Sequence, residues 1–342
     1  MKDIFQIYKD IFSDKPKWRY YSKMDIDPFK SDCNTKEFIA RFIELSGKAQ
    51  ENPLYDNISI LDNFRLRHIV STYFLGTYLY FNVKPIKESI DIVINRFKIQ
   101  NQDSKIEFSF IWFLICLFHD LGYSIENTEK YSNFDEFING KVKYFLNKRV
   151  GVPALYKDVY INYFNYRLRS EKDFLRKPDH GICGGIILFN KLNEILSSKS
   201  KNKKSEGLSW NKKLVNIYRY ASWVILSHNI FFIRKGESDE QVYRDNNLET
   251  LILDETETSK IILKKHSFLF LFALVDSIDP IKIYDSFENL KKLKCCIDKN
   301  TIVLETVNDN LQMDYYKKVL DLKRWIIPNI EESNNKLKIE II

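Results

Sequence analysis

The chain has 342 residues, 44% of them hydrophobic, and a formal net charge of +7. This length and composition suit a folded protein with a large core and exclude a largely disordered one. The charge suits an anionic ligand or nucleic acid without identifying either. Only 10 Gly and 8 Pro interrupt regular structure. Because these residues are the strongest helix breakers, their scarcity favours an α-rich fold.

The cysteines and the N-terminus indicate the compartment. The chain has five cysteines, an odd number without a CxxC pair, which gives no disulfide framework. Residues 1–12 mix charged with apolar side chains and lack the small-residue cleavage site of a signal peptide. The longest apolar run, residues 110–118, is far shorter than the ~20 residues of a membrane-spanning helix. We therefore expect a cytoplasmic protein with no membrane span.

Apolar residues at three- and four-residue spacing predict helices through the first two-thirds of the chain. Two polar segments between them, 197–205 and 236–258, are predicted to be surface loops. The predicted helices cover residues 36–47, 62–82, 85–98, 106–120, 134–148, 179–196, 211–228 and 262–278.

The C-terminal part of the chain changes character. Its pattern predicts strands at 293–297 and 301–306, a helix at 311–326, and a half-buried strand at 336–342, where charged and apolar residues alternate. The sequence thus predicts a mainly α protein, in which residues 1–290 form a helical bundle and residues 291–342 a small α/β appendage.

Two of the predicted helices are apolar on every side and end in a carboxylate. The run IWFLICLF leads into His119 and Asp120, and the run FLFLFALV leads into Asp276. A buried carboxylate is unfavourable unless a cation or hydrogen bonds compensate it, and a divalent cation bound by these side chains would do so. The alternative is an ordinary helix end, at which His119 caps carbonyls and Asp120 reaches water.

Three further histidines lie near helix ends or on helix faces. His68 lies within helix 62–82, His180 begins the segment HGICGG, and His228 ends the apolar stretch YASWVILS. The glycines of HGICGG allow neighbouring helices to approach closely. A single histidine is more often a core or capping residue than a ligand, so the prediction depends on their joint order.

That joint order resembles the HD-domain superfamily of metal-dependent phosphohydrolases. The strings FHDLGYS, DHGICGG and SHNI are also similar to the family. The resemblance implies an HD-type helical bundle in which the first His, the His-Asp doublet and the last Asp hold one metal ion. The doublet's Asp and the two middle histidines would hold a second. The matching positions are His68, His119, Asp120, His180, His228 and Asp276.

The ligand types indicate the chemistry. Imidazole and carboxylate suit Mn, Fe or Zn and do not distinguish among them. The resemblance gives Asp120 the catalytic role of bridging two ions, an arrangement that activates water for attack on phosphorus. We therefore expect one or two divalent transition-metal ions and hydrolysis of a phosphoester or phosphoanhydride bond. The expected substrate is a nucleotide or another small phosphorylated molecule.

The chain departs from the family at one position. Many two-metal HD phosphodiesterases, and the related iron oxygenases, have Lys directly after the HD-x-G segment, where this chain has Tyr. Phosphate must then meet other groups, although solvated surface charge explains the cationic candidates equally well. The predicted substrate-binding residues are Tyr123, Arg65, Arg169 and Lys282.

Two nearby polar residues have simpler interpretations. Asp279 could orient a metal ligand, but a turn residue before Pro280 is the favoured interpretation. His266 follows two lysines and falls outside the family pattern, so we leave it outside the site.

Other functions remain open. The same ligand order occurs in di-iron oxygenases of the superfamily, which need redox-active iron and oxygen. A catalytically silent module could instead bind a nucleotide and regulate a partner through residues 291–342. Nucleic-acid binding by the basic segment 197–205 is a minor alternative, because that segment has no aromatic residue on which a base could stack. The pattern specifies no oligomeric state.

Overall fold

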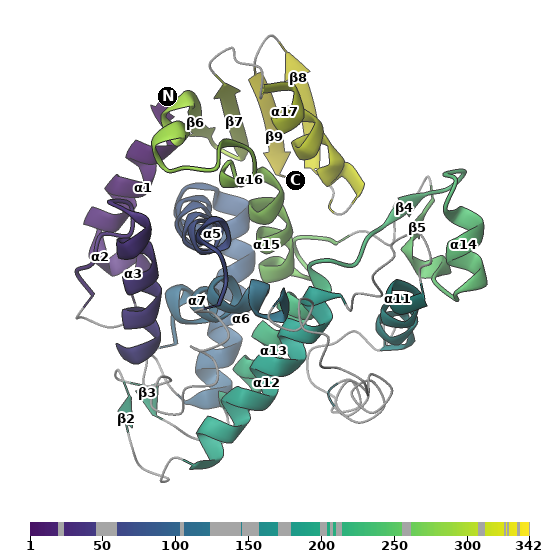
Figure 1. The fold of residues 1–342 in the computed structure, drawn as a ribbon, viewed down its shortest axis with the longest axis horizontal. Coiled ribbons are helices and arrows are strands. Elements are labelled where there is room, and N and C mark those ends of the chain that lie inside the picture. The colour runs from purple at the N-terminus through teal and green to yellow at the C-terminus, as the bar shows by residue number, and fades with distance from the viewer. Residues whose placement is uncertain are drawn as a thin grey trace.

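The computed structural model is mainly helical, with a small antiparallel sheet built largely from C-terminal strands (Figure 1). None of the described helices combines the length and the apolar composition that crossing a membrane requires. The described residues are 1–19, 24–45, 60–102, 106–123, 145, 157–169, 179–198, 204–205, 208–209, 214–254, 261–306, 312–324, 326, 328–333 and 336–341.

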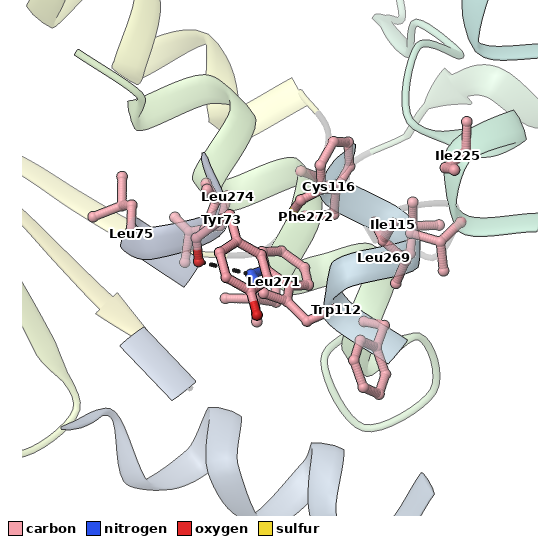
Figure 2. Close-up of a cluster of buried hydrophobic side chains, with 14 of the residues drawn as sticks. Tyr73, Leu75, Trp112, Ile115, Cys116, Ile225, Leu269, Leu271, Phe272 and Leu274 are labelled. Carbon is pink, nitrogen blue, oxygen red and sulfur yellow. Dashed lines mark hydrogen bonds between the residues drawn. The ribbon is translucent and has the colours of Figure 1, made fainter. Parts of the chain in front are cut away.

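Three helices that are apolar on most sides form the centre of the fold. Trp112 and Phe272 pack edge to face, with ring centroids 5.9 Å apart, and join two of these helices. The indole Nε1 of Trp112 donates a hydrogen bond of 3.0 Å to the carbonyl oxygen of Tyr73 on the third, as Figure 2 shows. A fully apolar helix is stable only when other helices surround it. The three are α5 (Asn63–Asn82), α7 (Phe108–Phe118) and α15 (Ser267–Ile278).

Amphipathic helices cover this centre. α1 and α3 pack against α5, α6 packs against α5 and α15, and α13 packs against α7, α15 and α12. A Cβ on Gly185 would lie 2.5 Å from the carbonyl oxygen of Ser222, so glycine is what allows α12 and α13 to approach. The covering helices are α1 (Ile4–Ser13), α2 (Lys15–Trp18), α3 (Asp32–Leu45), α6 (Lys84–Asn101), α12 (His180–Ser198) and α13 (Leu214–Ser227).

The five-stranded sheet has the order β1-β6-β7-β9-β8, and every pair in it is antiparallel. In β7 and β9, buried apolar residues alternate with more exposed ones, as a sheet with one covered face requires. α17 (Gln312–Leu320) and the 3-10 helix η7 (Asp321–Arg324) pack against α15 and so connect this region to the bundle. The strands are β1 (Lys2–Asp3), β6 (Leu293–Asp298), β7 (Thr301–Thr306), β8 (Pro328–Ser333) and β9 (Lys336–Ile341).

Shorter elements lie beside the bundle, and in Figure 1 α11, α14, β4 and β5 lie together on one side of it. Ile281–Tyr284 (α16) packs against α5 and follows the end of α15. The others are α11 (Lys157–Arg169), β2 (Lys204–Ser205), β3 (Leu208–Ser209), β4 (Ile233–Arg234), α14 (Glu240–Asp245), η5 (Glu249–Leu251), β5 (Ile252–Leu253) and η6 (Glu288–Lys292).

The mainly helical prediction is confirmed, with corrections at the ends of elements. The helix predicted at 262–278 begins only at Ser267, because residues 263–265 form a turn that His266 ends. The helix predicted at 106–120 changes after Phe118 into a 3-10 turn. The helix predicted at 134–148 lies outside the described residues, apart from the buried Phe145.

Some elements were not predicted from the sequence. Among them are α1, α11, β8, the short strand β1, and α14 within a segment expected to be a loop. β1 pairs with β6, Lys2 facing Cys295, so the sheet is not made of residues 291–342 alone. The segment expected as a loop at 197–205 contains the end of α12 and the strand β2.

Candidate metal centre

The His-Asp doublet lies in a 3-10 turn, η2 (His119–Gly122), at the end of the buried helix α7. Gly122 lets this turn contact the start of α12 directly, because a Cβ there would lie 1.9 Å from the carbonyl oxygen of His180. Gly184 faces the same turn, its Cβ position 3.0 Å from the backbone nitrogen of Gly122. Close backbone contact therefore brings His180 beside the doublet.

Three of the predicted ligands form one compact group. His68, His119 and Asp276 each offer a ligand atom, and these atoms lie within 4.8 Å of one another. Across the part of the chain that the structure describes, this is the group that could hold a metal ion. His68 Nε2 lies 3.1 Å from Asp276 Oδ1. The ligands come from α5, the end of α7 and α15, so the central helices build the group.

His119 and His228 are both held through Nδ1, which leaves Nε2 as the nitrogen available to a ligand. His119 Nδ1 donates to the carbonyl oxygen of Cys116 at 2.8 Å, and His228 Nδ1 donates to that of Ile225 at 2.5 Å. A carbonyl oxygen only accepts, so in the neutral ring Nε2 carries the lone pair. Metal-binding histidines are commonly held in this way.

His119 has an unusual feature for a buried residue. Its Nε2 is buried and has no hydrogen-bond partner, although it lies 3.2 Å from Asp120 Oδ1 without hydrogen-bond geometry. Burial lowers the pKa of His119 to about 4, and the opposing effect of Asp120 does not reverse this. The ring is therefore neutral near pH 7, and a buried lone pair without a donor fits a metal ligand.

The carboxylates of the site stay ionised despite burial. For Asp276, burial acts to raise the pKa, but Lys282 and His68 hold it well below its usual value. For Asp120, burial likewise acts to raise the pKa, and the histidines around it lower it. The pKa of His68 is raised, since Asp276 and Asp279 outweigh burial and Lys282. Ionised carboxylates beside the neutral imidazole of His119 suit Mn, Fe or Zn.

The four predicted histidines form a continuous row of rings. Ring centroids are 5.0 Å apart between His68 and His119, and 5.7 Å apart between His119 and His228. His228 and His180 are 5.3 Å apart at the far end. Asp120, His180 and His228 lie outside the compact group of ligand atoms. The second ion that the resemblance implies therefore has no comparable cluster among the described residues.

Two predicted substrate-binding residues stack on the far end of this row. The ring of Tyr123 lies parallel to that of His180, with centroids 3.9 Å apart. The guanidinium carbon of Arg65, a residue of α5, lies 3.6 Å from the centre of the Tyr123 ring. The residue in place of the family's Lys thus connects a histidine to an arginine.

The other two predicted substrate-binding residues differ in position. Lys282 Nζ lies 2.6 Å from Asp276 Oδ1, next to the compact group. Arg169 is the last residue of α11, and its side chain lies outside the described residues.

Asp279 shows a role that the favoured sequence interpretation missed. It is fully buried, and its Oδ2 lies 2.5 Å from His68 Nδ1. It also accepts from the backbone nitrogen of Ile281 at 3.4 Å, so the turn interpretation was incomplete rather than wrong. Its spacing of three residues from Asp276 was the available signal.

Lys318 of α17 was not predicted either. Burial and the charge of Lys282 lower its pKa to about 8, while Asp276 and Asp279 act in the opposite direction. The half-buried ammonium group of Lys318 therefore interacts electrostatically with the carboxylates of the site. Lys318 lies outside residues 68–276, which the predicted ligand pattern spans, so the sequence did not indicate that it lies near the site.

No family model, curated protein or solved structure matches the chain. The resemblance to HD-domain phosphohydrolases stays a prediction, and the function is argued below from the chemistry of the site.

Proposed function

We propose that this protein is a metal-dependent phosphohydrolase that cleaves a phosphoester or phosphoanhydride bond of a nucleotide or another small phosphorylated molecule. One observation carries the proposal: the neutral, buried His119 presents an Nε2 without a hydrogen-bond partner beside His68 and Asp276. A buried nitrogen lone pair with no donor is unfavourable in a metal-free core and is satisfied by a cation.

His68, His119 and Asp276 would hold a divalent transition-metal ion, with Asp120 next to them. Such an ion would act as a Lewis acid, lowering the pKa of a bound water and stabilising charge on phosphoryl oxygens. Because the low pKa of Asp120 keeps its carboxylate ionised, it can accept a hydrogen bond from a water molecule and orient it.

Positive charge beside the group supports a phosphorylated substrate. Lys282 contacts Asp276, and Lys318 of α17 interacts electrostatically with the same carboxylate. Arg65 lies over Tyr123 at the other end of the histidine row. Cations at both ends of the row suit an extended polyanion such as a nucleotide, whose phosphates they would attract.

The test is a substrate screen with the full-length protein loaded with Mn²⁺, Fe²⁺ or Zn²⁺. Phosphodiesters, nucleoside triphosphates, dinucleotides and nucleotide monophosphates are incubated, and products are identified by mass spectrometry. Asp276→Asn should abolish product formation, because the neutral amide removes a ligand charge. His266→Ala serves as the matched control, since this histidine lies outside the row, and it should keep the parent's activity.

Two outcomes would overturn the proposal. In the first, the Asp276→Asn variant cleaves a substrate as fast as the parent. In the second, the parent cleaves no phosphorylated substrate with any of the metals. Oxygen consumption by the iron-loaded protein without phosphate-bond cleavage would identify the oxygenase alternative instead.

A further inference from the structure

A buried chain of hydrogen bonds runs from the N-terminal helix α1 to the candidate ligand His68. The hydroxyl of Tyr8 lies 2.7 Å from Ser71 Oγ, and Ser71 in turn donates to Asp279 Oδ1. The other carboxylate oxygen of Asp279 lies 2.5 Å from His68 Nδ1. Tyr8, Ser71 and Asp279 are fully buried, and His68 is 3% exposed. These hydrogen bonds therefore connect buried residues that lie up to 271 positions apart in the sequence. They lead from α1 through α5 to the end of α15.

The direction of each hydrogen bond follows from the number of protons available. A carboxylate accepts only, so Ser71 gives its single hydroxyl proton to Asp279, and Tyr8 must then donate to Ser71. Burial, and the charge of Asp279 next, raises the pKa of Tyr8 well above its usual value, so its proton is retained. His68 Nδ1 is likewise the donor to Asp279. The other nitrogen, Nε2, lies 3.1 Å from Asp276 Oδ1. That carboxylate also only accepts, so Nε2 is the donor in this hydrogen bond, and a bound cation would take the place of its proton.

We propose that Tyr8, Ser71 and Asp279 form a positioning relay that fixes the orientation and tautomer of His68 for cation binding. The inference rests on the metal centre of the proposed function. Asp279 fixes the ring through a charge-assisted bond, and the two hydroxyls keep that carboxylate oriented. Groups that support a ligand in this way contribute strongly to metal affinity without touching the metal.

The packing around Tyr8 supports a fixed relay. Its ring is stacked with Phe29, with centroids 5.7 Å apart at 28°, and lies 6.3 Å from the ring of Phe74 on α5. The N-terminal helix therefore has a second contribution besides burying apolar surface. It supplies the first donor, Tyr8, of a chain of hydrogen bonds that ends at His68.

The experiment measures Co²⁺ affinity of the full-length, metal-free protein by visible absorption, without any substrate. Three variants interrupt the relay at successive steps: Asp279→Asn, Ser71→Ala and Tyr8→Phe. We expect Asp279→Asn to weaken Co²⁺ binding by about 10- to 100-fold, and Ser71→Ala and Tyr8→Phe by successively smaller factors. Tyr73→Phe is the matched control, because this buried tyrosine of α5 donates its hydroxyl to the carbonyl of Trp18 instead.

A second measurement separates positioning from general stability. In the Zn²⁺-loaded protein, ¹⁵N-edited NMR of the histidine rings should show a downfield Nδ1–H proton for His68, which moves upfield in Asp279→Asn and Tyr8→Phe but not in Tyr73→Phe. Stability to urea is measured on the same samples. A purely structural role would lower stability in both tyrosine variants and leave the His68 signal unchanged, and this result would overturn the relay.

The outcomes distinguish the relay from the metal centre. If the parent binds Co²⁺ and all three relay variants bind it equally well, the relay is wrong and the metal centre stands. If the parent binds neither Co²⁺ nor Zn²⁺, the metal centre and the relay that depends on it are both wrong. Weaker binding in the relay variants alone supports both.

Discussion

The two ends of the histidine row are built differently. At one end, His68 and His119 lie with Asp276 in a compact group, and Lys282 and Asp279 contact it. At the other end, His180 and His228 face each other, and the aromatic ring of Tyr123 covers His180. The first end has a compact group of ligand atoms that includes a carboxylate, whereas at the second end a buried carboxylate, Asp179, interacts with His228 without forming such a group.

The difference has a physical source in the helices that build each end. The first end draws on α5, α7 and α15, whose apolar surroundings strengthen electrostatic interactions and leave His119 Nε2 without a donor. The second end depends on the backbone approach of α12 to α13 and η2, which Gly122 and Gly185 allow. One end is therefore specified by charge and the other by close packing.

The largest expected effect is at the first end. His119→Ala removes the Nε2 without a partner, so the purified protein should lose at least one equivalent of transition metal, as elemental analysis will measure. His266→Ala should keep the parent's metal content, because His266 lies at the start of α15 and outside the row. Equal metal content in parent and His119→Ala, with circular dichroism showing both folded, would remove His119 from the site.

The second prediction compares the ends during turnover. Asp120→Asn should stay inactive at every metal concentration, because it removes the carboxylate charge beside His119 that we propose orients water. His180→Ala should lower kcat by a smaller factor and recover in part at high metal concentration, since the compact group remains. The measurement is the rate across a metal titration. Recovery of Asp120→Asn without recovery of His180→Ala would reverse the roles assigned to the two ends.

The third prediction concerns the packing of the second end. Gly185→Ala places a Cβ 2.5 Å from the backbone oxygen of Ser222, so α12 and α13 must separate. We expect a loss of about 1–3 kcal/mol in the free energy of unfolding, the usual range for overpacking, measured by urea denaturation. Ile92→Ala, at a residue 62% exposed on α6, should change it by less than about 0.5 kcal/mol. Similar stability of the two variants would mean that the helices are not in close contact.

The smallest effect is expected from the stack over His180. Tyr123→Leu removes the ring beneath Arg65, so KM for the phosphorylated substrate should rise about two- to fivefold, the equivalent of ~0.5–1 kcal/mol for a partly exposed cation–π contact. The metal content should not change. Tyr78→Leu on α5 is the control, because Tyr78 is not part of the stack. A change in kcat with KM unaffected would contradict a role in substrate binding.

Local patterns predicted much of the bundle and the candidate ligands. The limits of α5 and β7 agree with the predicted ranges almost residue for residue, because hydrophobic periodicity is a local property. The helix α1 was not predicted, although Ile4, Ile7 and Ile11 give it a buried face at helical spacing. The candidate metal ligands at helix ends could be predicted because each directly follows an apolar run in the sequence.

Local sequence patterns predicted the helical class of the protein, the apolar helices of the centre and the candidate histidines and aspartates. They did not predict which side chains and strands meet in the fold: His68 with Asp279, Asp279 with Ser71, Lys318 with the carboxylates of α15, and β1 with β6. The physical reason is that periodicity depends on neighbours within a few residues. The environment that sets a side chain's partner, tautomer and pKa comes instead from segments that only packing places beside it.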